Sequence, residues 1–422
     1  MHENINPPEK TILISVTSKG SDRELAIEHL TELELLAETA GAHVTEKIYQ
    51  ELEKPNPSFV VGKGKLEEIR ESIRDGGVSS IIFDDDLTPA QVRNLERELD
   101  VKALDRSGLI LDIFASRAKS LEAKTQVELA QLQYMLPRLS RMWQHLSKQL
   151  GGIGTKGPGE TQIETDRRLI REKITKLKEK LNDIETQHQQ QRKGRENFPR
   201  FALVGYTNAG KSTLMNAMTN SGVYVEDKLF ATLDTTTRAF ALPDGTKALL
   251  SDTVGFIRKL PAHLVASFRS TLAEARECDV LIHVVDITNT HYEDQIRVVN
   301  ETLESLKIAN KPTVLALNKI DVAEDKNILQ SIAENLPNSV PISAKRSINI
   351  LKLLDTLQST YSQTRKSVFI RLPYSDFSRI SDVYRFGNVI VRRDTDTGIE
   401  FELEIFSDKQ EYFNREFENL IC

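Results

Sequence analysis

Short apolar runs alternate with helical patterns over the first 115 residues. Runs rich in Ile, Val and Phe predict strands at residues 11–16, 44–49 and 79–83, with 59–61 as a further short candidate. Between these runs, apolar side chains spaced by three and four predict helices over residues 22–40, 65–75 and 89–99. Strands that alternate with helices form parallel sheets covered by the helices, so residues 1–115 are predicted to be one α/β domain.

Two long helices are predicted for residues 116–196. Their apolar seams are Leu129, Leu132, Leu136, Leu139, Trp143, Leu146 and Leu150, and then Ile170, Ile174, Leu177, Leu181 and Ile184. Such seams bury each other when two helices run antiparallel, so the pattern predicts a helical hairpin. Pro137 is expected to kink the first helix. The polar run 187–197 is predicted to be a linker.

The segment between the two helices is rich in glycine, with five glycines in residues 151–159. Glycines this dense do not fit a helix interior, and they allow tight turns or a close approach of the backbone to a ligand. Residues 116–195 also hold 17 Lys and Arg against 9 Asp and Glu, in a chain whose net charge is −6. A basic segment in an acidic chain indicates a polyanionic partner, although a solvated helix surface would explain the charge equally well.

The composition restricts the class of protein. Hydrophobic residues make up 39% and charged residues 28% of the 422 residues, which is typical of a globular protein and excludes collagen-like or disordered chains. The two cysteines, Cys278 and Cys422, cannot form a disulfide framework or a Cys-rich zinc module. The apolar runs are far shorter than the roughly 20 residues that span a bilayer, and no signal peptide is recognised. We therefore expect a cytoplasmic protein without a membrane span.

A phosphate-binding motif indicates that the chemistry lies in an α/β domain over residues 197–364. The motif G-x-x-x-x-G-K-[ST] follows an apolar strand at 201–204 and precedes a helix at 213–218. In such a loop, backbone N–H groups and the helix N-terminus bind phosphate oxygens. Lys211 would neutralise the β- and γ-phosphates, and the Ser212 hydroxyl would bind Mg²⁺. The residues of the motif are Gly205, Tyr206, Thr207, Asn208, Ala209, Gly210, Lys211 and Ser212.

Three later motifs favour GTP over ATP. After a predicted hairpin of strands 238–242 and 247–250, Asp252 can hold Mg²⁺ through water and the Gly255 N–H can reach the γ-phosphate. At the end of a strand at 313–317, the Asp321 carboxylate can accept from N1–H and the exocyclic amine of guanine, a donor pair that adenine lacks. After a strand at 340–342, the Ala344 N–H can reach guanine O6. The full motifs are Asp252, Thr253, Val254 and Gly255; Asn318, Lys319, Ile320 and Asp321; and Ser343, Ala344 and Lys345.

These motifs in register resemble the G domain of translation-factor-type GTPases. The resemblance implies that Thr232 is the switch I threonine, which binds Mg²⁺ only when the γ-phosphate is present. Its segment consists of Phe230, Ala231, Thr232, Leu233 and Asp234, and the nearby Thr235, Thr236 and Thr237 are alternatives. The residues expected to act in catalysis are Lys211, Thr232, Gly255 and Asn208, and the metal ligands are Ser212 and Thr232.

Two residues bear on how GTP would be hydrolysed. Phe256 follows Gly255, at the position where signalling GTPases carry the glutamine that orients the attacking water. Phenylalanine cannot orient water, so we predict slow intrinsic hydrolysis that needs a partner or another group. Asn208 resembles the asparagine that coordinates K⁺ in potassium-activated GTPases, and K⁺ there could replace an arginine finger. A hydrogen bond within the loop is the alternative role for Asn208.

The order of the parts resembles that of the HflX-type ribosome-associated GTPases. The predicted α/β domain 1–115, basic hairpin 116–196 and G domain 197–364 precede a small α+β domain over 365–422, with strands at 368–372, 388–392 and 400–406. The most specific element is GGIGTKGPGETQIETDRR at 151–168. The resemblance implies binding to the large ribosomal subunit and its rRNA, and the splitting or rescue of stalled ribosomes. We expect a monomer that binds the subunit in the GTP-bound state and that could also aid ribosome biogenesis.

The basic residues of the hairpin fit an approach to RNA. Lysine and arginine neutralise phosphates, and glycine backbone fits where side chains would clash. The residues concerned are Lys156, Arg167, Arg168, Arg171 and Lys173.

Two other functions remain open. The N-terminal domain could act as an RNA-remodelling NTPase if residues 59–65 formed a second phosphate-binding turn, although that run lacks the Walker spacing and favours a plain strand-to-helix turn. Alternatively, the hairpin could be a dimerisation coiled coil in a GTPase switch that recruits a protein or a tRNA-modifying partner.

Overall fold

The computed structural model describes residues 9–142, 158–192, 198–219, 229–230, 235–259, 273–322, 336, 338–406, 410–417 and 420. The chain divides into two compact units. The first contains residues 1–189, 226–234 and 259–271, and the second contains 190–225, 235–258 and 272–422. None of the helices that the structure describes combines the length and the apolar character needed to cross a membrane.

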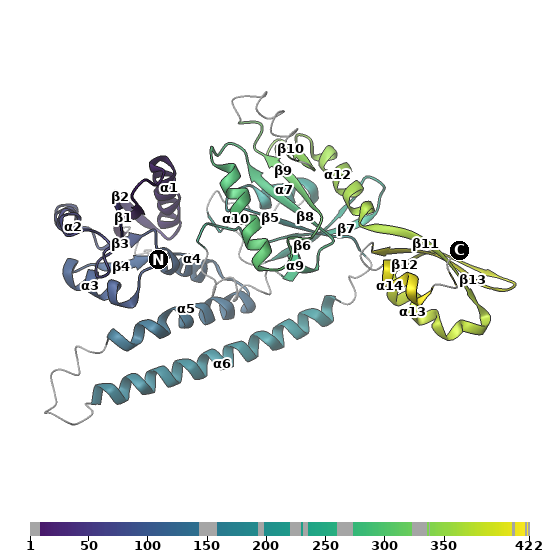
Figure 1. Ribbon diagram of the computed structural model, residues 1–422, viewed down its shortest axis with the longest axis horizontal. Coiled ribbons are helices and arrows are strands. Elements are labelled where there is room, and N and C mark those ends of the chain that lie inside the picture. The colour runs from purple at the N-terminus through teal and green to yellow at the C-terminus, as the bar shows by residue number, and fades with distance from the viewer. Residues whose placement is uncertain are drawn as a thin grey trace, which may run out of the picture. The chain divides into compact units, whose positions relative to one another are not determined.

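The N-terminal part of the first unit is a parallel sheet with strand order β2-β1-β3-β4 (Figure 1). The strands are β1 (Glu9–Ser18), β2 (Ala42–Leu52), β3 (Ser80–Phe83) and β4 (Lys102–Asp105). The helices are α1 (Arg23–Thr39), α2 (Lys63–Gly76), α3 (Pro89–Leu99) and α4 (Arg106–Arg117). Ile12, Ile14, Ile69, Ile81 and Leu95 are among the residues that form its buried core. The predicted α/β alternation is confirmed, and β4 and α4 are additions to it.

The prediction of a short strand at 59–61 is wrong. Asn56 and Val60 exchange backbone hydrogen bonds of 2.9 and 2.8 Å, which closes a tight turn ahead of α2. The side-chain oxygen of Asn56 accepts from the Ser58 and Phe59 amides. Val60 adopts a φ of +68°, a conformation that no strand residue has. The segment is therefore a strand-to-helix turn, as favoured above for residues 59–65.

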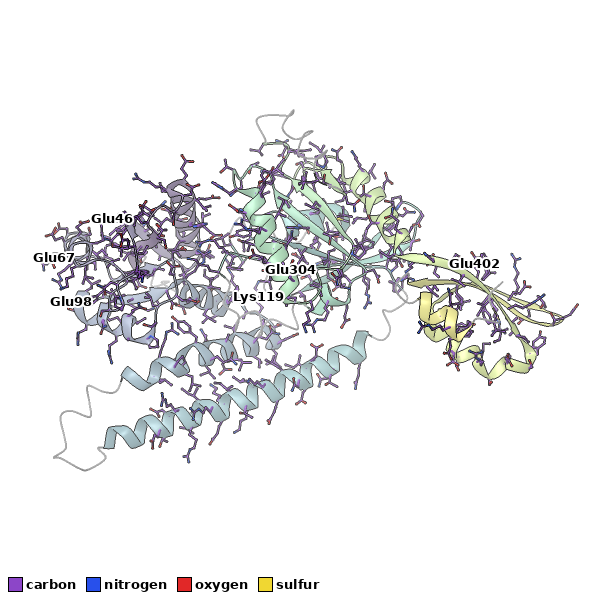
Figure 2. All side chains as sticks on the ribbon, viewed as in Figure 1. Glu46, Glu67, Glu98, Lys119, Glu304 and Glu402 are labelled. Carbon is purple, nitrogen blue, oxygen red and sulfur yellow. The ribbon has the colours of Figure 1, made fainter. Side chains whose placement is uncertain are left out.

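Two kinds of charged contact occur in this sheet domain. At the surface, Arg70 on α2 donates to Glu67, at 2.7 Å, and to Glu98 on α3. Figure 2 labels both carboxylates. Water screens such exposed pairs, so the apolar core must carry most of the stability. In the interior, the 1% exposed Arg106 donates to Asp84 at 2.8 Å, which pairs a charge that would be costly to bury alone.

The first unit also contains the helical hairpin, made of α5 (Leu121–Met142) and the longer α6 (Pro158–Arg192). Leu129, Ile174 and Leu177 are buried between the two helices, with Leu132, Leu136, Ile170 and Leu181 packed beside them. The predicted seam is therefore confirmed in this stretch. Trp143, Leu146, Leu150 and residues 151–157 of the glycine-rich segment lie outside the described residues.

α5 continues as helix through Pro137, with five further residues assigned to it, and the kink expected there stays a prediction. One detail of the hairpin departs from expectation. α6 extends to Arg192, so the polar run predicted to be a linker from 187 begins as helix. Glutamine and arginine favour helices even when no apolar face is present, which explains the extra turns.

The second unit is built around a six-stranded sheet with strand order β10-β9-β8-β5-β7-β6. The strands are β5 (Arg200–Gly205), β6 (Thr236–Ala241), β7 (Lys247–Asp252), β8 (Val280–Asp286), β9 (Thr313–Asn318) and β10 (Ser339–Pro341). Within this sheet β6 pairs antiparallel with β7, and the other pairs are parallel. The helices are α7 (Lys211–Thr219), α9 (Ala273–Glu277), α10 (Tyr292–Ser305) and α12 (Ile350–Gln363). The carboxyl ends of the parallel strands lie at one edge, where α/β sheets bind their ligands.

A small antiparallel sheet completes the second unit, in the order β11-β13-β12. Its elements are β11 (Arg365–Pro373), the 3₁₀ helix η1 (Tyr374–Arg379), α13 (Ile380–Phe386), β12 (Asn388–Thr395), β13 (Gly398–Phe406) and α14 (Gln410–Glu416). Alternate residues of β11 and β13 point into a core that also contains Phe413 and Phe417. The first residue of β13, Gly398, must be glycine because a Cβ there would lie 2.4 Å from the Leu372 carbonyl oxygen. The predicted α+β character of this region is confirmed.

His283 on β8 makes folding of the second unit sensitive to acid. Burial, and then the positive charge of Lys211, lower the pKa of His283 to about 4 from 6.5. The unfolded chain therefore binds one more proton than the folded chain between those values, and stability must fall as the pH drops from 6.5 to 4. The loss in the free energy of unfolding is at most about 3 kcal/mol.

In urea unfolding across this pH range, the free energy of unfolding should change less steeply with pH for His283→Gln than for wild type. The matched control is His291→Gln on a partly exposed residue, and an equal slope for all three proteins would contradict the assignment.

Candidate functional site

The phosphate loop joins β5 to α7 and needs glycine at two positions. Gly205 has a φ of +151°, and a Cβ there would lie 2.3 Å from the carbonyl oxygen of Val284. Gly210 has a φ of +95°, and a Cβ there would lie 2.3 Å from the Asn318 side-chain nitrogen. Between them Asn208 has a φ of +60°, a left-handed conformation that asparagine tolerates. Close packing therefore shapes this loop, and any ligand would meet its backbone.

Lys211 lies under the phosphate loop at the start of α7. Its ammonium group donates to the carbonyl oxygens of Gly205 and Tyr206, at 3.0 and 2.8 Å. Its side chain is 7% exposed, and burial lowers its pKa to about 8 although the charge of Asp252 opposes the change. A positive charge buried in this way would be stabilised by an anion at the loop. The arrangement suits the binding of phosphate.

Two oxygen donors lie where a metal ion would meet the phosphates. The Ser212 hydroxyl, on α7, donates to a carboxylate oxygen of Asp252 at the end of β7, at 2.7 Å. Mg²⁺ prefers oxygen ligands and commonly takes one or two from the protein, with phosphate and water completing its shell. The pair therefore fits Mg²⁺. No cluster of three or more His, Cys, Asp or Glu that could hold a metal is present in the described part of the chain.

The loop after β7 packs directly on the phosphate loop. The Phe256 amide donates to the Gly205 carbonyl oxygen at 3.0 Å, and the Thr207 amide donates to the Phe256 carbonyl oxygen at 2.8 Å. A Cβ on Gly255 would lie 3.0 Å from the Lys211 ammonium nitrogen. The Gly255 backbone therefore lies beside the residue that would hold the terminal phosphates. The Phe256 side chain is 2% exposed and has no polar group to orient a water molecule.

Asn318 connects three loops of the site. Its side-chain nitrogen donates to the carbonyl oxygen of Ala209 in the phosphate loop, at 2.8 Å. Its side-chain oxygen accepts from the amide of Ala344, at 2.9 Å. Asn318 itself is the last residue of β9, directly before the loop that contains Asp321. The phosphate loop and both loops predicted to read the base are therefore held together by one buried amide.

The Asp321 carboxyl is favoured in its charged form, which accepts hydrogen bonds. A hydrogen bond from the Ser343 hydroxyl, with a smaller contribution from Arg346 and Lys345, lowers the pKa of the Asp321 carboxyl below its ordinary value. Lys319 makes an ion pair with Asp286, at 2.7 Å. Sequence reasoning did not find Asp286, although its place at the end of an apolar strand, β8, is a signal that it faces the same edge.

The predicted site residues fall into three groups. The phosphate loop and the residues of the three later motifs lie at one edge of the sheet in the second unit. Phe230 belongs to the first unit, where it is buried and its ring meets Phe114 edge-on, with centroids 4.6 Å apart. The rest of the predicted switch I segment lies outside the described residues: Ala231, Thr232, Leu233 and Asp234.

Comparison with known proteins matches three family models to successive parts of the chain. A model described as "GTP-binding GTPase N-terminal" matches residues 27–115, and one described as "GTP-binding GTPase Middle Region" matches 117–195. A third, "50S ribosome-binding GTPase", matches residues 200–319. The last match contains the phosphate loop and the Asp252 motif, and it ends at Lys319, before Asp321.

Individual relatives agree with these models. GTPase HflX of Flavobacterium psychrophilum is 55% identical over 313 residues, which is 74% of this chain and 76% of that protein. GTPase HflX of Lacrimispora saccharolytica is 45% identical over 394 residues, 93% of this chain and 92% of that protein. Among solved structures, a GTP-binding protein of Sulfolobus solfataricus in complex with GDP is 29% identical, with 84% of this chain and 99% of that chain covered and a TM-score of 0.43.

The lowered pKa of Lys211 makes nucleotide binding depend on pH. Phosphate charges must raise the pKa of Lys211 in the complex, so binding takes up a proton above pH 8. The affinity should then fall by about tenfold for each further pH unit until the raised pKa is reached. Calorimetry at pH 7.5 and 9, in two buffers of different ionisation enthalpy, measures the affinity and the proton uptake together.

Lys211→Arg is the matched variant, because arginine stays charged throughout this range. Ionisation of the nucleotide affects both proteins equally, so only the wild type should show the additional fall and the additional proton. Equal pH dependence in the two proteins would mean that Lys211 keeps its charge in the empty site.

Proposed function

Since this chain belongs to the HflX family of GTPases, we propose that it couples Mg²⁺-dependent GTP hydrolysis to binding of the large ribosomal subunit. In this proposal the GTP-bound protein engages the subunit and its rRNA, and it splits or rescues stalled ribosomes or aids ribosome biogenesis. It acts as a cytoplasmic monomer with the four-part division 1–115, 116–196, 197–364 and 365–422. The observation that carries the nucleotide part is the Asn318 amide, which joins the phosphate loop to both base-reading loops.

The phosphate end of the site supports hydrolysis of a nucleoside triphosphate. Lys211 would bind the β- and γ-phosphates from below the loop, while the Gly255 amide meets the γ-phosphate. Ser212 would bind Mg²⁺ directly, and Asp252 would bind it through water, as their 2.7 Å contact supports. Thr232 would complete this ligand set only with GTP. The ion would neutralise charge that develops on the phosphate oxygens during hydrolysis.

Asn208 is proposed to replace the missing glutamine by binding K⁺. Asn208 is exposed in the phosphate loop, so its side chain is accessible to a ligand. K⁺ held there would place a positive charge between the β- and γ-phosphates. The buried Phe256 cannot contribute to catalysis through its side chain, which leaves this role to a cation or a partner.

The hairpin is proposed to contact rRNA. Four basic residues lie exposed on α6: Arg171, Lys176, Lys178 and Lys180. Polyanion binding by such a surface is strongly salt-dependent. The apolar seam of the hairpin is buried within one chain, by Leu129, Ile174 and Leu177. This internal use of the seam disfavours the alternative of a dimerisation coiled coil.

Asp321→Asn should change the base preference. The amide would place a donor where guanine also has donors, so affinity for GTP should fall by about a hundredfold, because a buried polar pair would be mismatched. Xanthine carries a carbonyl oxygen in place of the exocyclic amine and should then bind better than guanine. Fluorescence titration with labelled GTP and XTP measures both affinities. Asp244→Asn, in the turn between β6 and β7, is the distant control, and an unchanged GTP preference in Asp321→Asn would refute the base assignment.

Deletion of residues 151–159 should leave GTP binding intact and reduce binding to large ribosomal subunits by at least about tenfold. The measurement is sedimentation with purified subunits in the presence of GDP or a non-hydrolysable GTP analogue. A double reversal, Arg171→Glu with Lys178→Glu, should weaken the same interaction, whereas Lys352→Glu on α12 serves as a charge control. Full subunit binding after the deletion would refute the proposed role of the hairpin.

A further inference from the structure

Tyr206, the second residue of the phosphate loop, reaches the loop after β7 through its side chain. Its hydroxyl accepts a hydrogen bond from the Arg258 amide, at 2.9 Å. The phosphate-loop motif leaves this position open to any residue, so the motif does not explain a tyrosine. The side chain is 8% exposed, and it therefore spans the packed region between the two loops.

This hydrogen bond is the third of a set that holds the loop after β7 in place. The other two are the backbone bonds of Phe256 to Gly205 and Thr207, at 3.0 and 2.8 Å. They hold Phe256, the residue after Gly255, through both its amide and its carbonyl group. The tyrosine hydroxyl fixes the chain two residues further on, at Arg258, where no backbone bond to the phosphate loop occurs in the described residues.

The position of Gly255 shows why the docking matters for chemistry. A Cβ there would lie 2.9 Å from a methyl group of Thr207 and 3.0 Å from the Lys211 nitrogen, so the Gly255 backbone packs closely against the phosphate loop. In the proposed function the amide of Gly255 contacts a terminal phosphate. An amide that contacts this phosphate must be held at a fixed distance to contribute to its binding.

We infer that Tyr206 is a positioning residue for the γ-phosphate: its hydroxyl holds the loop after β7 so that the Gly255 amide distinguishes GTP from GDP. The inference rests on the proposed function, in which Gly255 contacts the γ-phosphate. GDP is bound through the phosphate loop and the base loops, which do not need the Arg258 contact. Loss of the hydroxyl therefore weakens binding of GTP and hydrolysis but spares GDP.

Tyr206→Phe tests the hydroxyl alone, since phenylalanine keeps the ring and removes only the hydroxyl group. The affinity for a non-hydrolysable GTP analogue should fall by about tenfold, which corresponds to about 1.4 kcal/mol, with a similar loss in kcat. The affinity for GDP should stay within about twofold of wild type. Tyr292→Phe on α10, which removes a hydroxyl that contacts Glu293 at 3.3 Å, is the matched control. A purely structural role would lower the melting temperature and both affinities together.

Substitution of Arg258 tests the same hydrogen bond from the donor side. Arg258→Pro removes the amide N–H, whereas Arg258→Ala shortens the side chain and keeps the N–H. Arg258→Pro should lose affinity for the GTP analogue as Tyr206→Phe does, whereas Arg258→Ala should keep it. The double variant Tyr206→Phe/Arg258→Pro should bind the analogue no more weakly than either single variant, because both substitutions remove the same hydrogen bond. Unchanged discrimination between GTP analogue and GDP in Tyr206→Phe, or fully additive losses in the pair, would overturn the inference. A wild-type protein that binds both nucleotides equally and does not hydrolyse GTP would overturn the proposed function, and the inference with it.

Discussion

The buried amide of Asn318 is the contact on which the geometry of the site depends. Its side chain bonds Ala209 in the phosphate loop and Ala344 in a loop that is proposed to read the base. A Cβ on Gly210 would lie 2.3 Å from the nitrogen of the same amide, so the Asn318 side chain packs against the phosphate loop where only glycine fits. Parallel strands alone would bring these loops to one edge of the sheet, but their separation along that edge would be free to vary. The amide fixes this separation and hence the distance between a base and its phosphates.

Lys211 gives the site an electrostatic reason to bind phosphate. In the folded protein its ammonium group is surrounded by carbonyl oxygens and is almost completely removed from water. Burial lowers its pKa to about 8, which means that the charge is less stable there than in water. A phosphate group restores part of that lost stabilisation. Part of the free energy of phosphate binding therefore comes from relieving the desolvation of Lys211 in the empty site.

The sequence predicted those parts of the fold and site that have strong local signals. The strands before each motif, the phosphate loop and the seam of the hairpin depend on apolar periodicity and on glycines at fixed spacing. β4 and α4 were missed because β4 has four residues and α4 begins with a buried charge, Arg106, which pattern analysis takes for a surface residue. The apolar run 59–61 resembled a strand, yet hydrogen bonds from Asn56 convert it into a turn. The Tyr206–Arg258 bond joins residues 52 positions apart and leaves no trace in either segment.

The two ends of the site are held by different means, and this difference determines which substitutions can loosen each end. At the base end, side chains make the links: Asn318 to the phosphate loop, and Ser343 to Asp321. At the γ-phosphate end, the backbone of Phe256 and the hydroxyl of Tyr206 make them, between segments that follow different strands. Phe256, Tyr206 and Asn318 are all buried, at 2%, 8% and 3% exposed, so neither end can move without disturbing packed side chains. A single side-chain substitution can break the link at Asn318 or at Tyr206, whereas the backbone bonds of Phe256 do not depend on its side chain.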